Sequence, residues 1–107
     1  MKRGDLVTVA LPGDYGKPRP ALVIQSDLFD GHPAVTILPF SLELLDAPLF
    51  RLTIEPTPAN GLQKPSQIMI DNMQTVPRKK VGEVFGRLGD ETMVAVNRAL
   101  LLWVGLA

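Results

Sequence analysis

One arginine lies in a segment that restricts its own backbone. Arg19 stands between Pro18 and Pro20, directly before the apolar run of residues 21–24. Each proline holds its own φ at about −65° and favours an extended conformation at the residue before it, so the segment should be stiff. A guanidinium presents a planar fork of donors that matches a phosphate better than an ammonium does. Arg19 is therefore a candidate phosphate ligand, although an arginine before a proline is more often a solvated loop residue.

Other side chains could assist contact with a nucleic acid. Lys17 lies in the same stiff segment, Lys64 lies in a later loop, and residues 78–80 form a short basic run. The 11 basic and 11 acidic residues cancel, so the chain lacks the positive field of a protein that holds duplex DNA. Any such site must be local. Tyr15, in the glycine-containing loop at residues 12–17, could stack on a base or cover the edge of the core.

The composition removes several kinds of chemistry. The absence of cysteine excludes disulfides, thiolate catalysis and thiolate metal sites, and it fits the reducing cytoplasm. The single histidine, His32, lies in a turn-like sequence, so we expect neither a zinc site nor any other metal or cofactor. The first residues lack the apolar stretch of a signal peptide, and the longest apolar run, at residues 99–107, is shorter than the roughly 18 residues that span a bilayer. We expect a cytoplasmic protein without a membrane segment.

The elements that must position these side chains are short. A chain of 107 residues fits one compact domain, residues 1–107, and ten prolines with nine glycines favour a small β architecture over a helical bundle. Strands are predicted at residues 6–11, 20–26 and 35–40, where apolar runs are bounded by Gly, Pro and Asp. The second of these runs is apolar on both faces and should be central.

Three further strands complete the predicted sheet. Residues 50–55 alternate apolar and polar side chains, which is typical of a strand with one wet face. The next strand should turn Ile68 and Ile70 inward, with Gln67, Met69 and Asp71 on the outer face. Residues 81–88 contain two glycines and predict a strongly bent last strand.

A helix is predicted at the end of the chain. Asp90 is the predicted N-cap, and residues 92–104 contain neither Pro nor Gly. The helix is too apolar for a single buried face. The side chains that can cover the sheet are Met93, Val96, Leu100 and Trp103, and those that need another dry surface are Val94, Leu101, Leu102 and Val104. We therefore infer a homodimer, formed through the helix or a neighbouring strand.

Four short motifs, in this order and spacing, resemble a known family over nearly the whole chain. They are Gly4-Asp5-Leu6-Val7, Arg19-Pro20-Ala21-Leu22-Val23, the run of residues 35–41 with its Leu38-Pro39-Phe40-Ser41 ending, and Ile68-Met69-Ile70-Asp71. Together they look like the MazF/PemK toxins of bacterial toxin-antitoxin modules.

The resemblance implies a fold, an activity and site residues. The fold would be mainly β with a C-terminal helix, a small SH3-like β-barrel of the CcdB/PemK type. The activity would be that of a homodimeric, sequence-specific endoribonuclease that cuts single-stranded RNA without a metal, leaving a 2′,3′-cyclic phosphate and a 5′-hydroxyl. The family's catalytic arginine falls on Arg19, a strand-end Ser or Thr on Ser41, and an aspartate that binds or cleaves RNA on Asp71. A cognate antitoxin, expected to be acidic and partly disordered, would compete with RNA for Arg19.

The chain departs from part of the family pattern. Some members carry an arginine two residues before the aspartate, where this chain has Met69, and a histidine in the first loop, where it has Tyr15. A mechanism that relies on those two side chains cannot be transferred. Arg19, with a pKa above about 12, suits charge stabilisation better than proton abstraction. Ser41 suits a hydrogen-bonding role better than that of a nucleophile. With no side chain of ordinary pKa near 7 to assign, we expect slow catalysis.

Two alternatives stay open at this point. A CcdB-like toxin would share the fold but bind gyrase without nuclease activity, and Trp103 near the apolar C-terminus gives that reading some support. A non-catalytic barrel could bind RNA or a peptide, with residues 17–20 as the contact segment. The proposed RNA-binding residues are Tyr15, Lys17, Lys64 and Asp71. The RNA motif, the physiological target and the general acid and base do not follow from the sequence.

Overall fold

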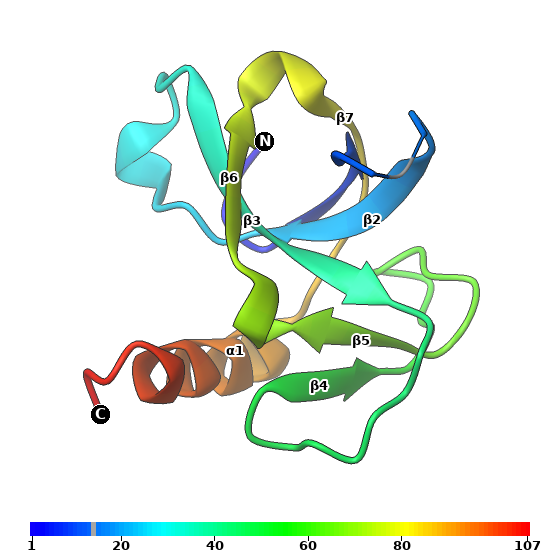
Figure 1. The fold of residues 1–107 in the computed structure, drawn as a ribbon, viewed down its shortest axis with the longest axis vertical. Helices are drawn as coiled ribbons and strands as arrows, with labels where there is room; N and C mark the ends of the chain where they lie inside the picture. The colour runs from blue at the N-terminus through cyan, green and yellow to red at the C-terminus, as the bar shows by residue number, and fades with distance from the viewer. Residues whose placement is uncertain (14) are drawn as a thin grey trace.

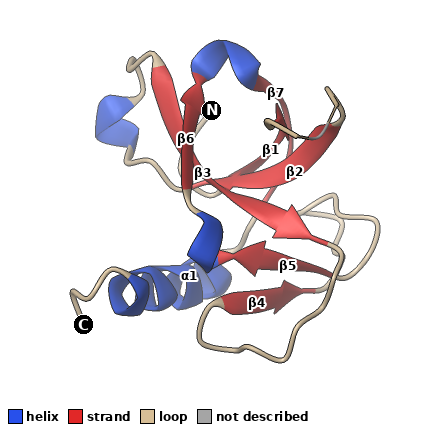
Figure 2. Cartoon of the chain, in the orientation of Figure 1, coloured by secondary structure: helices blue, strands red, loops and turns tan. Residues whose placement is uncertain are grey.

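The computed structural model describes residues 1–13 and 15–107, so Asp14 of the predicted first loop lies outside the described residues. Seven strands precede one α-helix, with three single-turn 3-10 helices between strands (Figures 1 and 2). The strands are β1 (Asp5–Ala10), β2 (Pro18–Val23), β3 (Ala34–Ser41), β4 (Arg51–Ile54), β5 (Ser66–Met69), β6 (Gln74–Pro77) and β7 (Val81–Arg87). The helices are η1 (Asp27–Phe29), η2 (Ile70–Asn72), η3 (Arg78–Lys80) and α1 (Asp90–Trp103).

The strands form one antiparallel sheet in the order β4-β5-β3-β2-β1-β7, with β6 also paired to β3. The pairing of β1 with β7 shifts register twice, which bends this edge as expected for a glycine-containing last strand. In Figure 1 the sheet curls over on itself, and α1 lies against the end that carries β4 and β5. The predicted class, mainly β with a C-terminal helix, is confirmed, and β2 is central as predicted.

Two apolar clusters fill the fold. The larger lies between the sheet and α1, and its completely buried members are Leu6, Leu22, Leu38, Ile68, Ile70 and Val96. The smaller lies inside the curl formed by β1, β2, β3 and β6, and includes Val7, Val9, Ala21, Val35, Ile37 and Val76. Because β2 and β3 contribute to both clusters, they are fixed from two sides.

The segment around Asp71 differs from the prediction. The strand expected to run through Asp71 ends at Met69, and residues 70–72 form a 3-10 turn instead. Gln67, expected on the outer face, is 3% exposed. The short strand β6 was not predicted, because its four residues include one buried apolar side chain and end in a proline.

Helix α1 begins one position earlier than predicted. Gly89 is its N-cap and makes no side-chain cap, whereas Asp90 is the first helical residue, so the prediction of Asp90 as N-cap is wrong. Asp90 and Glu91 both lie in the first turn, where negative charge favours the positive end of the helix dipole.

The helix leaves an apolar face without a partner inside the chain. Val96 and Ala99 are buried, and Met93 and Leu100 pack against the larger cluster. Trp103, expected to cover the sheet, is half exposed and contacts Phe50 with ring centroids 6.0 Å apart. The side chains that remain substantially exposed are Val94, Leu101, Leu102, Val104 and Leu106. The excess of apolar surface is confirmed, and the homodimer that would cover it stays a prediction.

Candidate active site

The register of two central strands brings the two predicted catalytic residues together. Strand β2 pairs antiparallel with β3, with Ala21 opposite Pro39. The ladder ends at this pair, and Arg19 and Ser41 each lie two residues beyond it, at the same end of the two strands. The backbone of Arg19 also pairs with Val9 of β1, so the stiffness predicted from its flanking prolines becomes a fixed position within a strand.

Arg19 and Ser41 line one open hollow of about 290 Å³. Its wall comes from six parts of the chain: the β1–β2 loop, β2, β3, the β3–β4 loop, β5 with its following turn, and β6. The lining residues are Leu11, Pro12, Arg19, Pro39, Phe40, Ser41, Leu42, Met69, Asn72 and Gln74. The hollow therefore combines a guanidinium, a hydroxyl and two carboxamides over an apolar floor.

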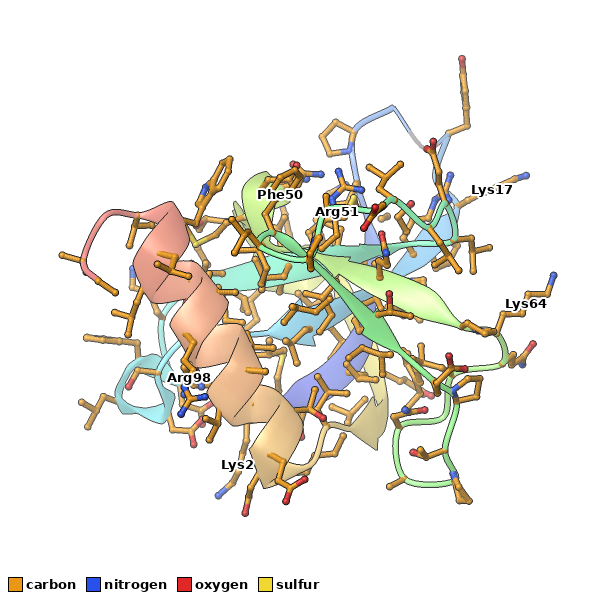
Figure 3. All side chains as sticks on the ribbon, turned by 90° about the horizontal axis from the view of Figure 1, so that it is seen from below. Lys2, Lys17, Phe50, Arg51, Lys64 and Arg98 are labelled. Atoms are coloured by element: carbon orange, nitrogen blue, oxygen red, sulfur yellow. The ribbon has the colours of Figure 1, made fainter. Side chains whose placement is uncertain are left out.

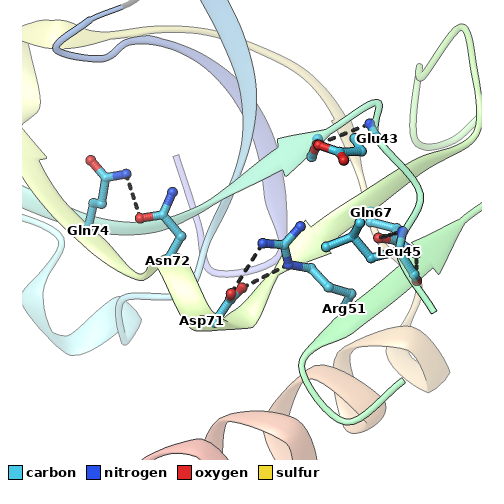
Figure 4. A network of polar contacts seen from close by, with 8 residues as sticks. Glu43, Leu45, Arg51, Gln67, Asp71, Asn72 and Gln74 are labelled. Carbon is cyan, nitrogen blue, oxygen red and sulfur yellow. Dashed lines mark hydrogen bonds and ion pairs between the residues drawn. The ribbon is translucent and has the colours of Figure 1, made fainter. Parts of the chain in front are cut away.

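The Ser41 hydroxyl has a defined orientation. The backbone N–H of Glu43 donates to Ser41 Oγ at 3.1 Å, as Figure 4 shows beside the label of Glu43. This bond uses one lone pair of the hydroxyl, and the hydroxyl's own proton remains a donor. Ser41 can thus give a hydrogen bond to an anionic oxygen in the hollow.

Two carboxamides that were not predicted complete the polar wall. Gln74 Nε2 donates to Asn72 Oδ1 at 3.1 Å, which joins the turn at residues 70–72 to β6 (Figure 4). Both side chains line the hollow with Arg19 and Ser41. No local sequence pattern identifies Asn72 and Gln74 as site residues, because they reach the hollow only through the turn that interrupts the predicted strand.

Asp71 is engaged within the chain. Arg51 Nε and Nη2 donate to the two carboxylate oxygens of Asp71 at 2.9 and 3.2 Å (Figure 4). The hydrogen bonds from Arg51 hold the pKa of the Asp71 carboxyl below its ordinary value, and desolvation opposes this only in part. The carboxylate is therefore charged at neutral pH and faces Arg51, while the neighbouring Asn72 lines the hollow.

Arg51 is the third unpredicted residue of this region. It is the cross-strand partner of Met69, the position at which some family members carry an arginine. The alternation of residues 50–55 correctly places Arg51 on the wetter face of its strand. Arg51 and Asp71 are 20 residues apart in the sequence, so no local pattern could predict their ion pair.

Two of the predicted RNA-binding side chains border adjacent hollows. Tyr15 and Lys80 line a hollow of about 540 Å³ that shares Leu11, Pro12 and Gln74 with the central one. Tyr15 is 99% exposed, so it does not cover the core edge.

The two predicted lysines, Lys17 and Lys64, do not line the central hollow. Lys64 lines a hollow of about 540 Å³ on the other side, which shares Leu42 with the central one and is otherwise mostly apolar, including Phe85. Lys17 is exposed directly before β2, and Figure 3 shows it and Lys64 on the same side of the molecule, away from Arg98. The fold thus places Arg19, Ser41, Tyr15 and Lys64 in neighbouring hollows that share lining residues.

Over residues 1–13 and 15–107, no three His, Asp or Glu side chains are grouped closely enough to hold a metal ion. In the same described ranges, no helix has the length and apolarity needed to cross a bilayer. What the hollow offers directly is a cation and neutral hydrogen-bond donors for an anionic group.

Known proteins share both the sequence and the fold. Residues 2–104 match the family of PemK-like, MazF-like toxins of type II toxin-antitoxin systems. A protein of Mycolicibacterium smegmatis described as a probable endoribonuclease MazF is 51% identical over 108 residues, which cover 100% of this chain and 99% of that protein.

Solved structures agree on the fold. The Mycobacterium tuberculosis toxin MazF-mt6 superposes with a TM-score of 0.82 at 24% identity, over 96% of this chain and 98% of the toxin. An endoribonuclease in complex with its cognate antitoxin, from a mycobacterial species, gives a TM-score of 0.81 at 20% identity, over 100% of this chain and 97% of the other. The resemblance first seen in four short motifs is confirmed across the chain: it belongs to the PemK-like, MazF-like toxins of type II toxin-antitoxin systems.

Proposed function

We propose that this toxin-family endoribonuclease cleaves single-stranded RNA at a short sequence motif, without a metal ion, to leave a 2′,3′-cyclic phosphate and a 5′-hydroxyl. Residues 1–107 would act as one toxin domain in the cytoplasm, where RNA is available. The observation that carries the proposal is that Arg19 and Ser41 line the same hollow. The two polar side chains come from adjacent strands, β2 and β3.

Cleavage of RNA by its own 2′-hydroxyl requires stabilisation of the negative charge that develops at the phosphate. The substrate's 2′-oxygen would attack the adjacent phosphorus while the bond to the departing 5′-oxygen breaks; the 2′-hydroxyl proton is released and the 5′-oxygen takes up a proton. Negative charge builds on the non-bridging oxygens during this exchange. The Arg19 guanidinium would hold that charge with its fork of donors, and the Ser41 hydroxyl would donate to one of the same oxygens. Neither side chain becomes covalently attached to the RNA.

Histidine would take no part in the proton transfers. His32 precedes β3, whose eight residues separate it from Ser41 at the other end. At about 3.3 Å per residue, a strand of this length separates His32 from Ser41 by roughly 20 Å or more. The imidazole is also tied to its turn, because Ala34 N donates to His32 Nδ1 at 3.0 Å. A slow enzyme is the expected consequence.

RNA on either side of the cleaved bond would follow the neighbouring hollows. Tyr15 is positioned to stack on a base on one side, and Lys64 to meet a phosphate on the other, with Lys17 adding positive charge next to Arg19. Asp71, if it contacts RNA, would do so as an acceptor for a base amine while still held by Arg51.

Protein partners would cover the remaining apolar surface. A second copy of the chain would bury the exposed face of α1, and a cognate antitoxin would compete with RNA at Arg19. The structurally similar endoribonuclease solved with its cognate antitoxin supports the existence of such a partner. Co-purification with the product of a neighbouring gene, followed by displacement with RNA, tests it.

The central test is cleavage of a long single-stranded RNA in EDTA, with the 5′ ends of all fragments mapped. Wild type should cut at a recurrent motif and leave 5′-hydroxyl ends, whereas Arg19→Ala and Ser41→Ala should leave the RNA intact. Ser26→Ala is the matched serine control, because Ser26 Oγ accepts from Leu28 N in the same local geometry, at the far end of β2. Arg98→Ala, on the helix, is the arginine control. Equal cleavage by all variants, or loss of cleavage in the controls, would overturn the assignment.

A further inference from the structure

The β3–β4 loop, residues 42–50, follows Ser41 directly and is poorly packed. Its leucines point largely to solvent: Leu42 is 63% exposed, Leu44 53% and Leu49 72%. Phe50, at the end of the loop, packs against the larger apolar cluster, but these leucines contribute little buried surface to hold the rest of the loop. Leu42 nevertheless forms part of the wall of both the Arg19 hollow and the Lys64 hollow, so the shape of both depends on how the loop is fixed.

One buried carboxamide fixes the middle of this loop. Leu45 N donates to Gln67 Oε1 at 2.9 Å, and Gln67 Nε2 donates back to Leu45 O at 2.9 Å (Figure 4). A carboxamide carries the same donor and acceptor as a peptide group, so Gln67 acts towards Leu45 as a neighbouring strand would. Gln67 Nε2 also donates to Thr53 Oγ1 at 3.1 Å, which ties the carboxamide itself to β4.

Gln67 is also part of the strand ladder that carries the site. Its backbone pairs with Ser41 on one side and with Thr53 on the other. One other non-local bond, from Ile70 N to Phe50 O, holds the end of the loop next to β4. The remaining hydrogen bonds described for the loop are local, from Glu43 N to Ser41 Oγ and from Phe50 N and Arg51 N to Ala47 O. Gln67 therefore connects the exposed loop to the strand that ends in Ser41.

We infer that Gln67 is a positioning residue of this enzyme: its carboxamide holds the β3–β4 loop in place as a wall of the RNA-binding hollows, and so sets which RNA sequence is cut. The inference rests on the proposed endoribonuclease function. Gln67 is almost completely buried, so it would act through the loop and not by touching RNA. Its loss should weaken RNA binding and relax sequence selection more than it slows the bond-breaking step.

The test compares Gln67→Leu with a carboxamide of the same type that bridges another part of the chain and is only partly buried. Gln25 holds a different loop in the same manner, with Nε2 donating to Phe29 O and Ala34 O and Oε1 accepting from Thr36 N. Gln67→Leu should raise KM for a motif-bearing RNA about 10-fold with kcat reduced less than about 3-fold, and should add cleavages at non-motif sites. Gln25→Leu should leave the motif and KM unchanged. Hydrogen exchange should show faster exchange at Leu45 in the first variant only.

A second variant guards against misfolding. Gln67→Glu keeps the shape and can still accept from Leu45 N, but as a carboxylate it cannot donate to Leu45 O. Its KM should approach that of wild type as the pH falls and the carboxyl regains its proton. Unchanged KM and motif in Gln67→Leu despite faster exchange at Leu45 would overturn the inference, as would an equal effect of Gln25→Leu. Wild type that cuts no RNA would refute the proposed function, while the exchange data would still report on the clamp.

Discussion

Replacing Arg51 with methionine removes both hydrogen bonds that Asp71 receives from it, while keeping an unbranched side chain on β4. The two bonds measure 2.9 and 3.2 Å, and the side chains are 14% and 22% exposed. Exposed ion pairs contribute less than about 1 kcal/mol, and hydrogen bonds to charged groups about 1.5–3 kcal/mol. A two-bonded, mostly shielded pair falls between these ranges, so we expect a coupling free energy of about 1–2 kcal/mol.

Urea unfolding of wild type, Arg51→Met, Asp71→Asn and the double variant measures that coupling directly. The pair also predicts a pH dependence. The folded pKa of Asp71 is lowered from its ordinary value of 3.8, so the ionised form is preferred by the native state. The stabilisation is complete above the unfolded pKa and is lost as the pH falls through the folded pKa. The stability difference between wild type and Arg51→Met should therefore shrink below about pH 4.

The control is the pair of Arg87 with Asp5, at 2.8 Å, in which the arginine is 53% exposed. Its coupling should be below about 1 kcal/mol, and Arg87→Met should leave cleavage unchanged. Arg51→Met should raise KM, because the turn that presents Asn72 to the hollow loses its tie to β4. A coupling indistinguishable from that of the control pair, or a stability difference that stays constant down to pH 2, would refute this account of the turn.

Three further outcomes follow from the geometry. Arg19→Lys should lower kcat about 100-fold, because an ammonium cannot reproduce the guanidinium fork; single-turnover cleavage measures this, and near wild-type rates would contradict it. Gly86→Ala should cost about 1–3 kcal/mol in urea unfolding, since the added Cβ would overlap the Asn60 carbonyl oxygen, whereas Gly31→Ala, in an exposed turn that faces open space, should not. Leu101→Asp should convert the expected dimer to a monomer in light scattering, and a dimer that persists would move the interface away from α1.

The sequence was most informative where one local pattern dominates. The apolar runs of β1, β2 and β3 and the uninterrupted helix were predicted because burial on one or two faces imposes a period on the chain. Gln67 was placed outward because a polar residue within an alternating pattern is normally solvated. It is buried because its carboxamide is fully satisfied by groups from two other segments. Such a partnership depends on tertiary contacts that alternation does not encode.

Within the candidate site, too, the residues predicted from the sequence were those with a local or family pattern. Arg19 was singled out from its flanking prolines, whereas Ser41 was identified through the family resemblance, since a serine at a strand end has no distinguishing local feature. Asn72, Gln74 and Arg51 were missed. Asn72 and Gln74 reach the hollow because the chain leaves the strand after Met69, and the same turn brings Asp71 to Arg51 of β4. The turn is accompanied by the burial of Ile70 and by the bond from Ile70 N to Phe50 O.

The turn at residues 70–72 also affects which positions of this fold can be substituted without disturbing the sheet. Strands β5 and β6 run in the same direction along one edge of β3, with Ile68 opposite Phe40 and Gln74 opposite Ile37. Between these pairs β3 advances three residues and the other strand six, so three residues are looped out of an otherwise continuous ladder. Substitutions at the outward positions of this excursion change what faces the hollow while the ladder on both sides keeps its register. The fold therefore separates the residues that can vary with the RNA target from those that hold the barrel together.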